Sequence, residues 1–196
     1  MKKLFAFLAA VCVSTGAVYA AGGDPSESGV PTSPLKIWSS GVGGGLLYSL
    51  NDDLKGTPGK SLGEVVWMNS FDFTDNFALF ADVNWYMADS GAANFGVDLG
   101  GDCMLSDGRV KPFVGLGIGA RYYDKLNGIE GKDGGTMGGS ALVRVGVALE
   151  LTETIEVRVR VPFQFAVIGE VNDMRVGAEV GVMFFSNFRN IRKLGY

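Results

Sequence analysis

Two glycines and an alanine near the middle of the chain have the spacing of a dinucleotide-binding turn. The stretch KPFVGLGIGARYYDK contains Gly115, Gly117 and Ala120 in the pattern G-x-G-x-x-A. In a dinucleotide site these glycines follow a parallel strand and begin a helix whose N-terminus holds the pyrophosphate. No helical pattern follows here, because Arg121 continues the alternation of polar and apolar residues. The stretch therefore predicts one strand, with Gly115, Gly117 and Gly119 on the same face, and no cofactor site.

The remaining candidates for chemistry are carboxylates. Histidine is absent from the chain, which excludes histidine-based proton transfer and the commonest metal ligand. Asp98 and Asp102 could form an acid–base pair, but their alternation places them on the same face as Arg121 and Lys111. Paired interior charges explain this arrangement better, and the acidic loops lack the spaced oxygen ligands of a calcium loop. We therefore predict no enzyme activity, no catalytic residues, no metal site and no cofactor.

The elements that position these residues are strands. From Leu35 onward no helical stripe is sustained, whereas period-two alternation recurs, most clearly in TIEVRVRVPFQFAV. The expected strands cover residues 35–50, 64–73, 77–88, 92–105, 110–124, 140–151, 155–168 and 174–185. Tight turns follow the second, fourth and sixth strands, and long polar loops follow the first and fifth. This pattern predicts an all-β fold, an eight-stranded antiparallel up-and-down transmembrane β-barrel.

Three turn sequences give the register of their hairpins. Across an Asp107–Gly108 turn the expected pairs are Val97 with Ile118, Leu99 with Leu116 and Asn94 with Arg121. Across the TDN turn they are Trp67 with Val83 and Phe73 with Phe77. Across the TET turn they are Val157 with Leu149 and Val159 with Val147. Apolar residues oppose apolar residues in each hairpin, and polar residues oppose polar ones. Because a slip of one residue would turn every side chain to the wrong face, this agreement supports the expected strands.

Arginine indicates which face of the barrel points inward. A soluble barrel of the lipocalin kind, with an apolar ligand inside, would place the polar face in water. The polar face here contains five arginines and only two lysines within strands, and arginine suits multidentate pairing in confined places. We therefore expect the apolar face to meet lipid and a salt-bridge network to close the interior. Its expected members are Asp82, Asp98, Asp102, Arg121, Arg144, Glu150, Glu156, Arg158, Arg160, Arg175 and Glu179.

Two alternatives remain open at this point. One is a soluble periplasmic barrel that binds an apolar ligand, and the other is a narrow pore. The pore is disfavoured because eight strands leave an interior that side chains can fill. Bulky residues are expected inside, among them Phe80, Tyr86 and Phe113.

Two segments resemble a known family, the small eight-stranded outer-membrane barrels of the opacity type and of the transmembrane domain of outer-membrane protein A. KPFVGLGIGARYYD is similar to the Pro-aromatic-Val-Gly-x-Gly-x-Gly strand of these porin-like barrels. RVGAEVGVMFF resembles the terminal-strand signal that the barrel assembly machinery reads, through Arg175, Gly177, Val180, Val182 and Phe184. The resemblance implies a Gram-negative cell envelope protein. It departs from the family because residues 186–196 follow the terminal Phe.

The termini indicate export. Residues 1–20 combine two lysines, an apolar stretch of about ten residues and a small-residue cleavage site, so they predict a signal peptide cleaved after Ala20. Residues 21–34 are expected to be a flexible periplasmic leader, residues 35–185 the barrel and residues 186–196 a short periplasmic tail. The sequence has no basic patch of the kind that would indicate binding to nucleic acid. The expected partners are outer-membrane lipid, the assembly machinery and a surface partner at loops 51–63 and 125–139, for a monomer with an envelope-structural or surface-interaction role.

Overall fold

The computed structural model describes eight β-strands and the chain close to their ends. The described residues are 38–51, 57–74, 76–87, 93–106, 108–124, 126, 135–152, 154–169 and 171–186. The expected signal peptide, the leader and all of the tail after Ser186 lie outside these residues. Within the described part of the chain, no helix is long and apolar enough to cross a membrane.

The eight strands form one closed sheet. They are β1 (Trp38–Ser49), β2 (Ser61–Thr74), β3 (Phe77–Met87), β4 (Ala93–Met104), β5 (Val110–Tyr123), β6 (Thr136–Glu150), β7 (Ile155–Ile168) and β8 (Val171–Ser186). Each strand pairs antiparallel with the next, and β8 pairs antiparallel with β1. The predicted eight-stranded up-and-down barrel is confirmed.

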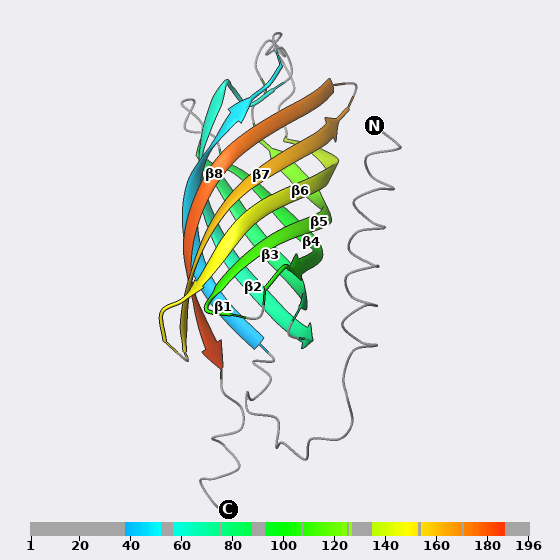
Figure 1. Ribbon diagram of the computed structural model, residues 1–196. Coiled ribbons are helices and arrows are strands. Elements are labelled where there is room, and N and C mark those ends of the chain that lie inside the picture. The colour runs from blue at the N-terminus through cyan, green and yellow to red at the C-terminus, as the bar shows by residue number, and fades with distance from the viewer. Residues whose placement is uncertain are drawn as a thin grey trace, which may run out of the picture.

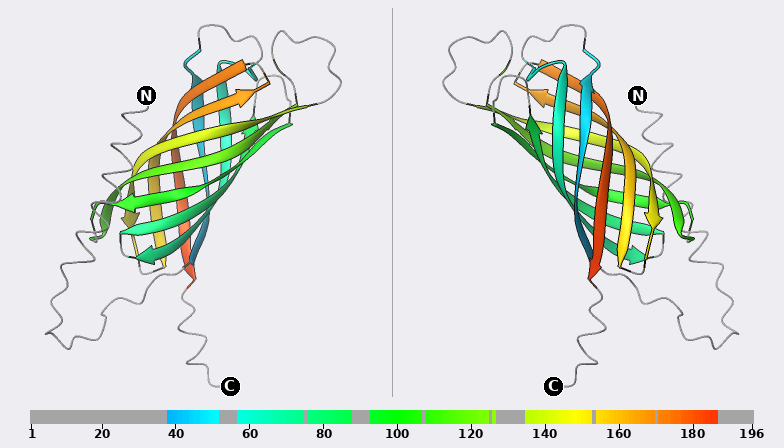
Figure 2. Two further views of the ribbon diagram at one scale, coloured as in Figure 1. Left: turned by 90° about the vertical axis from the view of Figure 1, so that its right-hand side faces the viewer. Right: turned by 90° about the vertical axis from the view of Figure 1, so that its left-hand side faces the viewer.

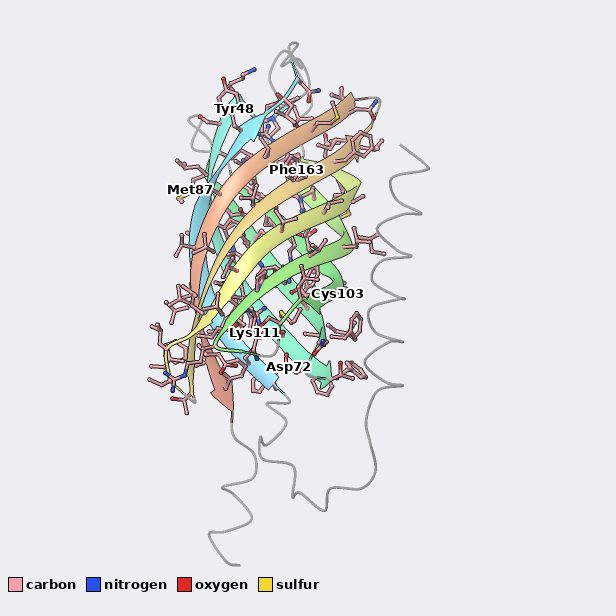
Figure 3. The ribbon with its side chains drawn as sticks, in the orientation of Figure 1. Tyr48, Asp72, Met87, Cys103, Lys111 and Phe163 are labelled. Atoms are coloured by element: carbon pink, nitrogen blue, oxygen red, sulfur yellow. The ribbon has the colours of Figure 1, made fainter. Side chains whose placement is uncertain are left out.

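The strands are tilted against the barrel axis, and the two ends of the barrel differ (Figures 1 and 2). β1 begins and β8 ends at the end that carries the tight turns, which we call the turn end. The opposite end carries the longer connections and is called the loop end. Figure 3 shows Tyr48, Met87 and Phe163 in the loop half, and Asp72, Cys103 and Lys111 in the turn half.

Several strands are longer at the loop end than the sequence predicts. β2, β6 and β8 begin three or four residues earlier than expected, at Ser61, Thr136 and Val171. Glycines interrupt the alternation in the Gly134–Gly139 stretch, and a glycine weakens the prediction of a strand interior. In the barrel β6 lies between β5 and β7, and pairing with these two strands extends it through the glycines. It pairs with β5 from Thr136 and with β7 from Gly139.

The predicted register is correct in one hairpin and altered in two. The pairs Leu149–Val157 and Val147–Val159 form as expected. Trp67 pairs with Val83 as predicted, but a bulge between Asp72 and Thr74 places Thr74 opposite Phe77, where Phe73 was expected. The hairpin of β4 and β5 is the larger correction: its pairs are Val97 with Ala120, Leu99 with Ile118 and Asn94 with Tyr123.

The turn between β4 and β5 explains this difference. Leu105 N–H donates to the carbonyl of Pro112 (2.8 Å), and Gly108 N–H donates to Ser106 Oγ (3.2 Å). Ser106 is therefore part of the turn, which is longer than two residues. The resulting shift is two residues, so every side chain keeps its predicted face.

The two faces of the sheet have opposite chemistry. At the outward positions of the described strands no side chain is charged, and many large apolar residues are exposed there, for example Val42 (57 %), Leu99 (54 %) and Ile118 (72 %). The inward positions hold the buried charged residues. An apolar-lined soluble barrel would require the reverse orientation of these faces.

Candidate functional site: the charged lumen

The glycines of β5 make room for long side chains in the barrel interior, called the lumen here. A Cβ at Gly115 would lie 2.9 Å from Arg144 Cγ and 2.1 Å from Asp102 Oδ1. A Cβ at Gly117 would lie 2.8 Å from Phe80 Cζ. The pattern that resembles a dinucleotide turn is thus a row of glycines beneath an arginine, an aspartate and a phenylalanine.

Arg144 is the centre of an ion-pair chain. Its side chain is 1 % exposed. Arg144 Nε donates to Asp102 Oδ1 (2.8 Å), Nη2 to Asp102 Oδ2 (2.5 Å) and Nη1 to Asp82 Oδ2 (2.8 Å). The guanidinium carbon lies 3.4 Å from the centroid of the Phe80 ring. Bidentate pairing of this kind fixes both the position and the orientation of the guanidinium plane.

Two further arginines extend the chain from Asp82 and Asp102. Arg160 Nη1 lies 2.6 Å from Asp82 Oδ2, and Arg160 Nε donates to Glu179. Arg158 Nε donates to Glu156 Oε1 (2.5 Å), and its Nη1 lies 3.8 Å from Asp102 Oδ2. The result is a continuous series of seven buried charged residues, in the order Glu179, Arg160, Asp82, Arg144, Asp102, Arg158 and Glu156.

A separate pair lies between β4 and β5. Arg121 Nη2 donates to Asp98 Oδ2 (2.7 Å), and Asn84 Nδ2 donates to the same oxygen (2.7 Å). The Arg121 side chain lies over Gly96, where a Cβ would be 2.7 Å from Nη1. Glycine on β4 therefore accommodates this arginine, as glycine on β5 accommodates Arg144.

Each end of the lumen carries one more pair. At the turn end Lys111 Nζ lies 2.8 Å from Glu150 Oε1, with side chains 18 % and 20 % exposed. Glu150 and Glu156 face each other across β6 and β7, and each has its own cation. At the loop end Arg175 Nε pairs with Asp173 Oδ2 (2.8 Å), and Arg175 Nη2 donates to the carbonyl of Gly59 (2.8 Å).

The structure brings most of the expected network members together. Ten of the eleven are buried, and Glu150 lies at the rim. Asp102 and Lys111 share the inward face as expected, where Asp102 contacts Arg144 and Arg158 and Lys111 contacts Glu150. Two buried members were missed, Glu64 and Asp173. Alternation with the outward Val65 and Trp67 could have placed Glu64 inside.

The residues of the expected assembly signal all lie on β8. Arg175 and Gly177 face the lumen, whereas Val180 and Phe184 face outward and are each 54 % exposed. Val182 shares this outward face and pairs with Val42 of β1. Of the two loops expected to meet a partner, residues 52–56, 125 and 127–134 lie outside the described part of the chain.

Aromatic side chains occur on the outward face at both ends of the barrel. Phe71, Phe73 and Phe77 lie near the turn end, with Phe71 and Phe73 ring centroids 5.1 Å apart in an edge-to-face contact. Near the loop end Phe95 stacks on Tyr122 with centroids 4.8 Å apart. The charged lumen thus lies within a barrel whose outer surface is apolar and aromatic.

Solved structures share this architecture. The chain is similar to neisserial surface protein A, with a TM-score of 0.59 and 13% sequence identity over 76% of this chain and 97% of that one. It is also similar to the N-terminal β-barrel domain of Pseudomonas aeruginosa OprF, with a TM-score of 0.51 and 13% identity over 74% and 97% of the two chains. No family model matches the chain, and no curated protein has a matching sequence.

These similarities establish the fold. The chain has the fold of the small eight-stranded outer-membrane β-barrels, which confirms at the level of fold the resemblance carried by its two glycine-containing strands.

Proposed function

We propose, on the premise of this fold, that the protein is an integral outer-membrane barrel with an envelope-structural or surface-interaction role. One observation carries the proposal: the outward face is uncharged and predominantly apolar in every described strand, and the charged side chains of the strands are inside. A soluble protein would have to expose this whole belt to water, whereas a membrane barrel presents it to lipid. An outward groove lined by Trp38, Phe71, Leu79, Leu99 and Ile118 offers apolar contact to acyl chains.

Cell fractionation with protease shaving tests the location. We expect the full-length protein in the detergent-extracted outer membrane, with migration on gels that changes on heating. Protease added to intact cells should cut within loops 51–63 and 125–139 and leave the turn end untouched. Recovery of the protein in the soluble periplasmic fraction would contradict the proposal and favour the ligand-binding soluble barrel.

In this proposal the lumen is closed by the charge network. Arg121, Arg144 and Phe113 are each at most 1 % exposed, and Thr57 at the end of the first loop is fully buried. An eight-stranded interior of this size is filled by side chains and leaves no channel. The purified protein in planar bilayers should give no reproducible single-channel steps, and stable steps would favour the narrow pore.

The proposal includes no catalysis. Six of the seven buried carboxylates in the described strands are held by arginines, and Asp82 and Asp102 each contact two of them. Arg144 binds both oxygens of Asp102, which favours a structural role over proton transfer. We assign the surface role to the loops, the export to a signal peptide cleaved after Ala20, and the membrane insertion to the assembly machinery through β8.

A further inference from the structure

Glu64 on β2 differs from every other buried acid that the structure describes. It is 2 % exposed, and neither carboxylate oxygen has a hydrogen-bond partner. The other six buried carboxylates each contact an arginine, namely Asp82, Asp98, Asp102, Glu156, Asp173 and Glu179. A buried ionised carboxylate without a partner is too costly to be retained in a stable fold.

A second acid faces Glu64 across β1. Gly45 of β1 pairs with Glu64 on one side and with Glu179 of β8 on the other. Because Gly45 has no side chain, Glu179 extends over it, where a Cβ would lie 2.7 Å from Glu179 Cγ, and only this glycine separates the two glutamates. Two ionised carboxylates are both acceptors, so a hydrogen bond between them exists only if one of them carries a proton.

The arginines on the surrounding strands are each paired with another carboxylate. Arg160 of β7 is engaged by Glu179 and Asp82, and Arg121 of β5 is engaged by Asp98. From β3, the group that faces Glu64 is the Tyr86 hydroxyl, which is buried and unpartnered. The buried residues of the described lumen comprise seven carboxylates and five guanidinium groups, an excess of two negative charges when all are ionised.

A metal ion does not account for this excess. Among the described residues, no group of three His, Cys, Asp or Glu side chains could hold one. We propose that Glu64 and Glu179 share one proton across Gly45, with Glu64 as the carboxylic acid and Glu179 as the carboxylate that Arg160 also binds. Tyr86, which pairs with Glu64 across β2 and β3, adds a hydroxyl and no positive charge beside this site.

This proton site lies at the seam where β1 and β8 close the barrel. Loss of the proton would leave one negative charge on β2 and one on β8, with β1 between them. Their repulsion would weaken the contact of β1 with β8 that closes the barrel. An unfolded Glu64 is ionised at neutral pH, so the unfolded state binds fewer protons than the folded state. The free energy of unfolding therefore falls as the pH rises, and the unfolding equilibrium constant increases by up to about tenfold per pH unit.

The test uses the full chain without its signal peptide, folded in detergent micelles. Infrared spectra at neutral pH should show the C=O stretch of a protonated carboxylic acid, and Glu64→Gln should remove it. Urea unfolding at neutral and alkaline pH should show that Glu64→Gln is at least as stable as the parent and lacks its alkaline loss of stability.

Asp98→Asn is the matched control, because it makes the same acid-to-amide change at a carboxylate that is paired with Arg121. It should be destabilised at neutral pH and should keep the infrared band. Three results would overturn the proposal: no protonated-acid band in the parent protein, a loss of stability in Glu64→Gln equal to that in Asp98→Asn, or a parent stability that depends on sodium when choline replaces it at constant ionic strength. The last result would identify a bound cation in place of the proton.

Discussion

Two sectors of the lumen are filled by different means. The charged sector, on β3, β4, β6 and β7, is filled by Asp82, Asp102, Arg144, Arg158 and Arg160. The methionine sector is formed by Val66 and Met68 of β2 and Met183 of β8. It lies against the glycines of β1 and β8, where the first and last strands meet. A fixed set of charge partners fills one sector, and flexible apolar side chains fill the other.

The difference follows from what each kind of side chain requires. A guanidinium group with two carboxylate partners must have its position and its angle right, and the strands that hold Arg144, Asp82 and Asp102 determine both. A methionine adapts its rotatable bonds to the available gap, so it tolerates small changes in backbone position. We infer that the charged sector specifies the arrangement of the central strands. The methionine sector tolerates small changes in backbone position where β1 and β8 close the barrel.

The largest expected effect comes from breaking the centre of the charged sector. Arg144→Met leaves Asp82 and Asp102 without their shared cation, and removal of one partner from a buried pair costs about 3–5 kcal/mol. Met68→Leu, a swap of similar volume in the methionine sector, should cost less than about 1.5 kcal/mol. Urea unfolding in detergent micelles measures both. Equal losses in the two variants would show that the sectors do not differ.

A second comparison concerns the space above the glycines of β5. In Gly117→Leu the new side chain meets Phe80 and the carbonyl of Leu99, which is 2.9 Å from the Cβ position. We expect a loss of about 3 kcal/mol or failure to form the heat-modifiable barrel, since overpacking of this kind displaces backbone.

Gly139→Leu is the control for this substitution. Gly139 is an exposed residue at an outward position of β6, and a Cβ there meets nothing within 4 Å. Its stability should stay within about 0.5 kcal/mol of the parent. Normal assembly of Gly117→Leu would contradict the inward position of the glycine row.

A third comparison sets a rigid contact against a flexible one. In Gly100→Ala the Cβ would lie 2.1 Å from the carbonyl oxygen of Leu116, which the β-ladder holds in place. In Gly181→Ala the nearest atom is Met68 Cε at 1.8 Å, the end of a flexible side chain that can move. We expect a loss of about 1–2 kcal/mol in the first variant and less than about 1 kcal/mol in the second. The reverse order in urea unfolding would show that the methionine sector is rigid.

The fold could be predicted from the sequence because period-two alternation and turn composition are local signals. The faces could be assigned because arginine, unlike lysine, is concentrated in the strands. The partners within the lumen could not be assigned, since Arg144 and Asp82 are 62 residues apart and meet only once the tilted sheet closes. The register of β4 and β5 also depended on the length of one turn, which Asp107–Gly108 alone does not determine.

Glu64 shows a further limit of the sequence pattern. On the same inward face of β2 it is followed by Val66 and Met68, which are apolar and fully or almost fully buried. Alternation with Val65 and Trp67 places Glu64 inside, but an inward face that changes from polar to apolar along one strand does not indicate its partner. The change marks the border between the Glu64–Glu179 pair and the methionine sector, and it becomes visible only when β8 is placed beside β1.

The smallest expected effect is at the rim of the charged sector, where Lys111 and Glu150 are partly exposed. Lys111→Ala should cost no more than about 1 kcal/mol, because solvent screens a pair in this position and ordering the long side chain has an entropic cost. Added salt should reduce the difference between the variant and the parent further. The same salt series should leave the large loss in Arg144→Met almost unchanged, since its carboxylate partners are out of reach of solvent. Urea unfolding at low and high salt measures both responses, and a strong salt dependence at Arg144 would mean that water and ions enter the lumen.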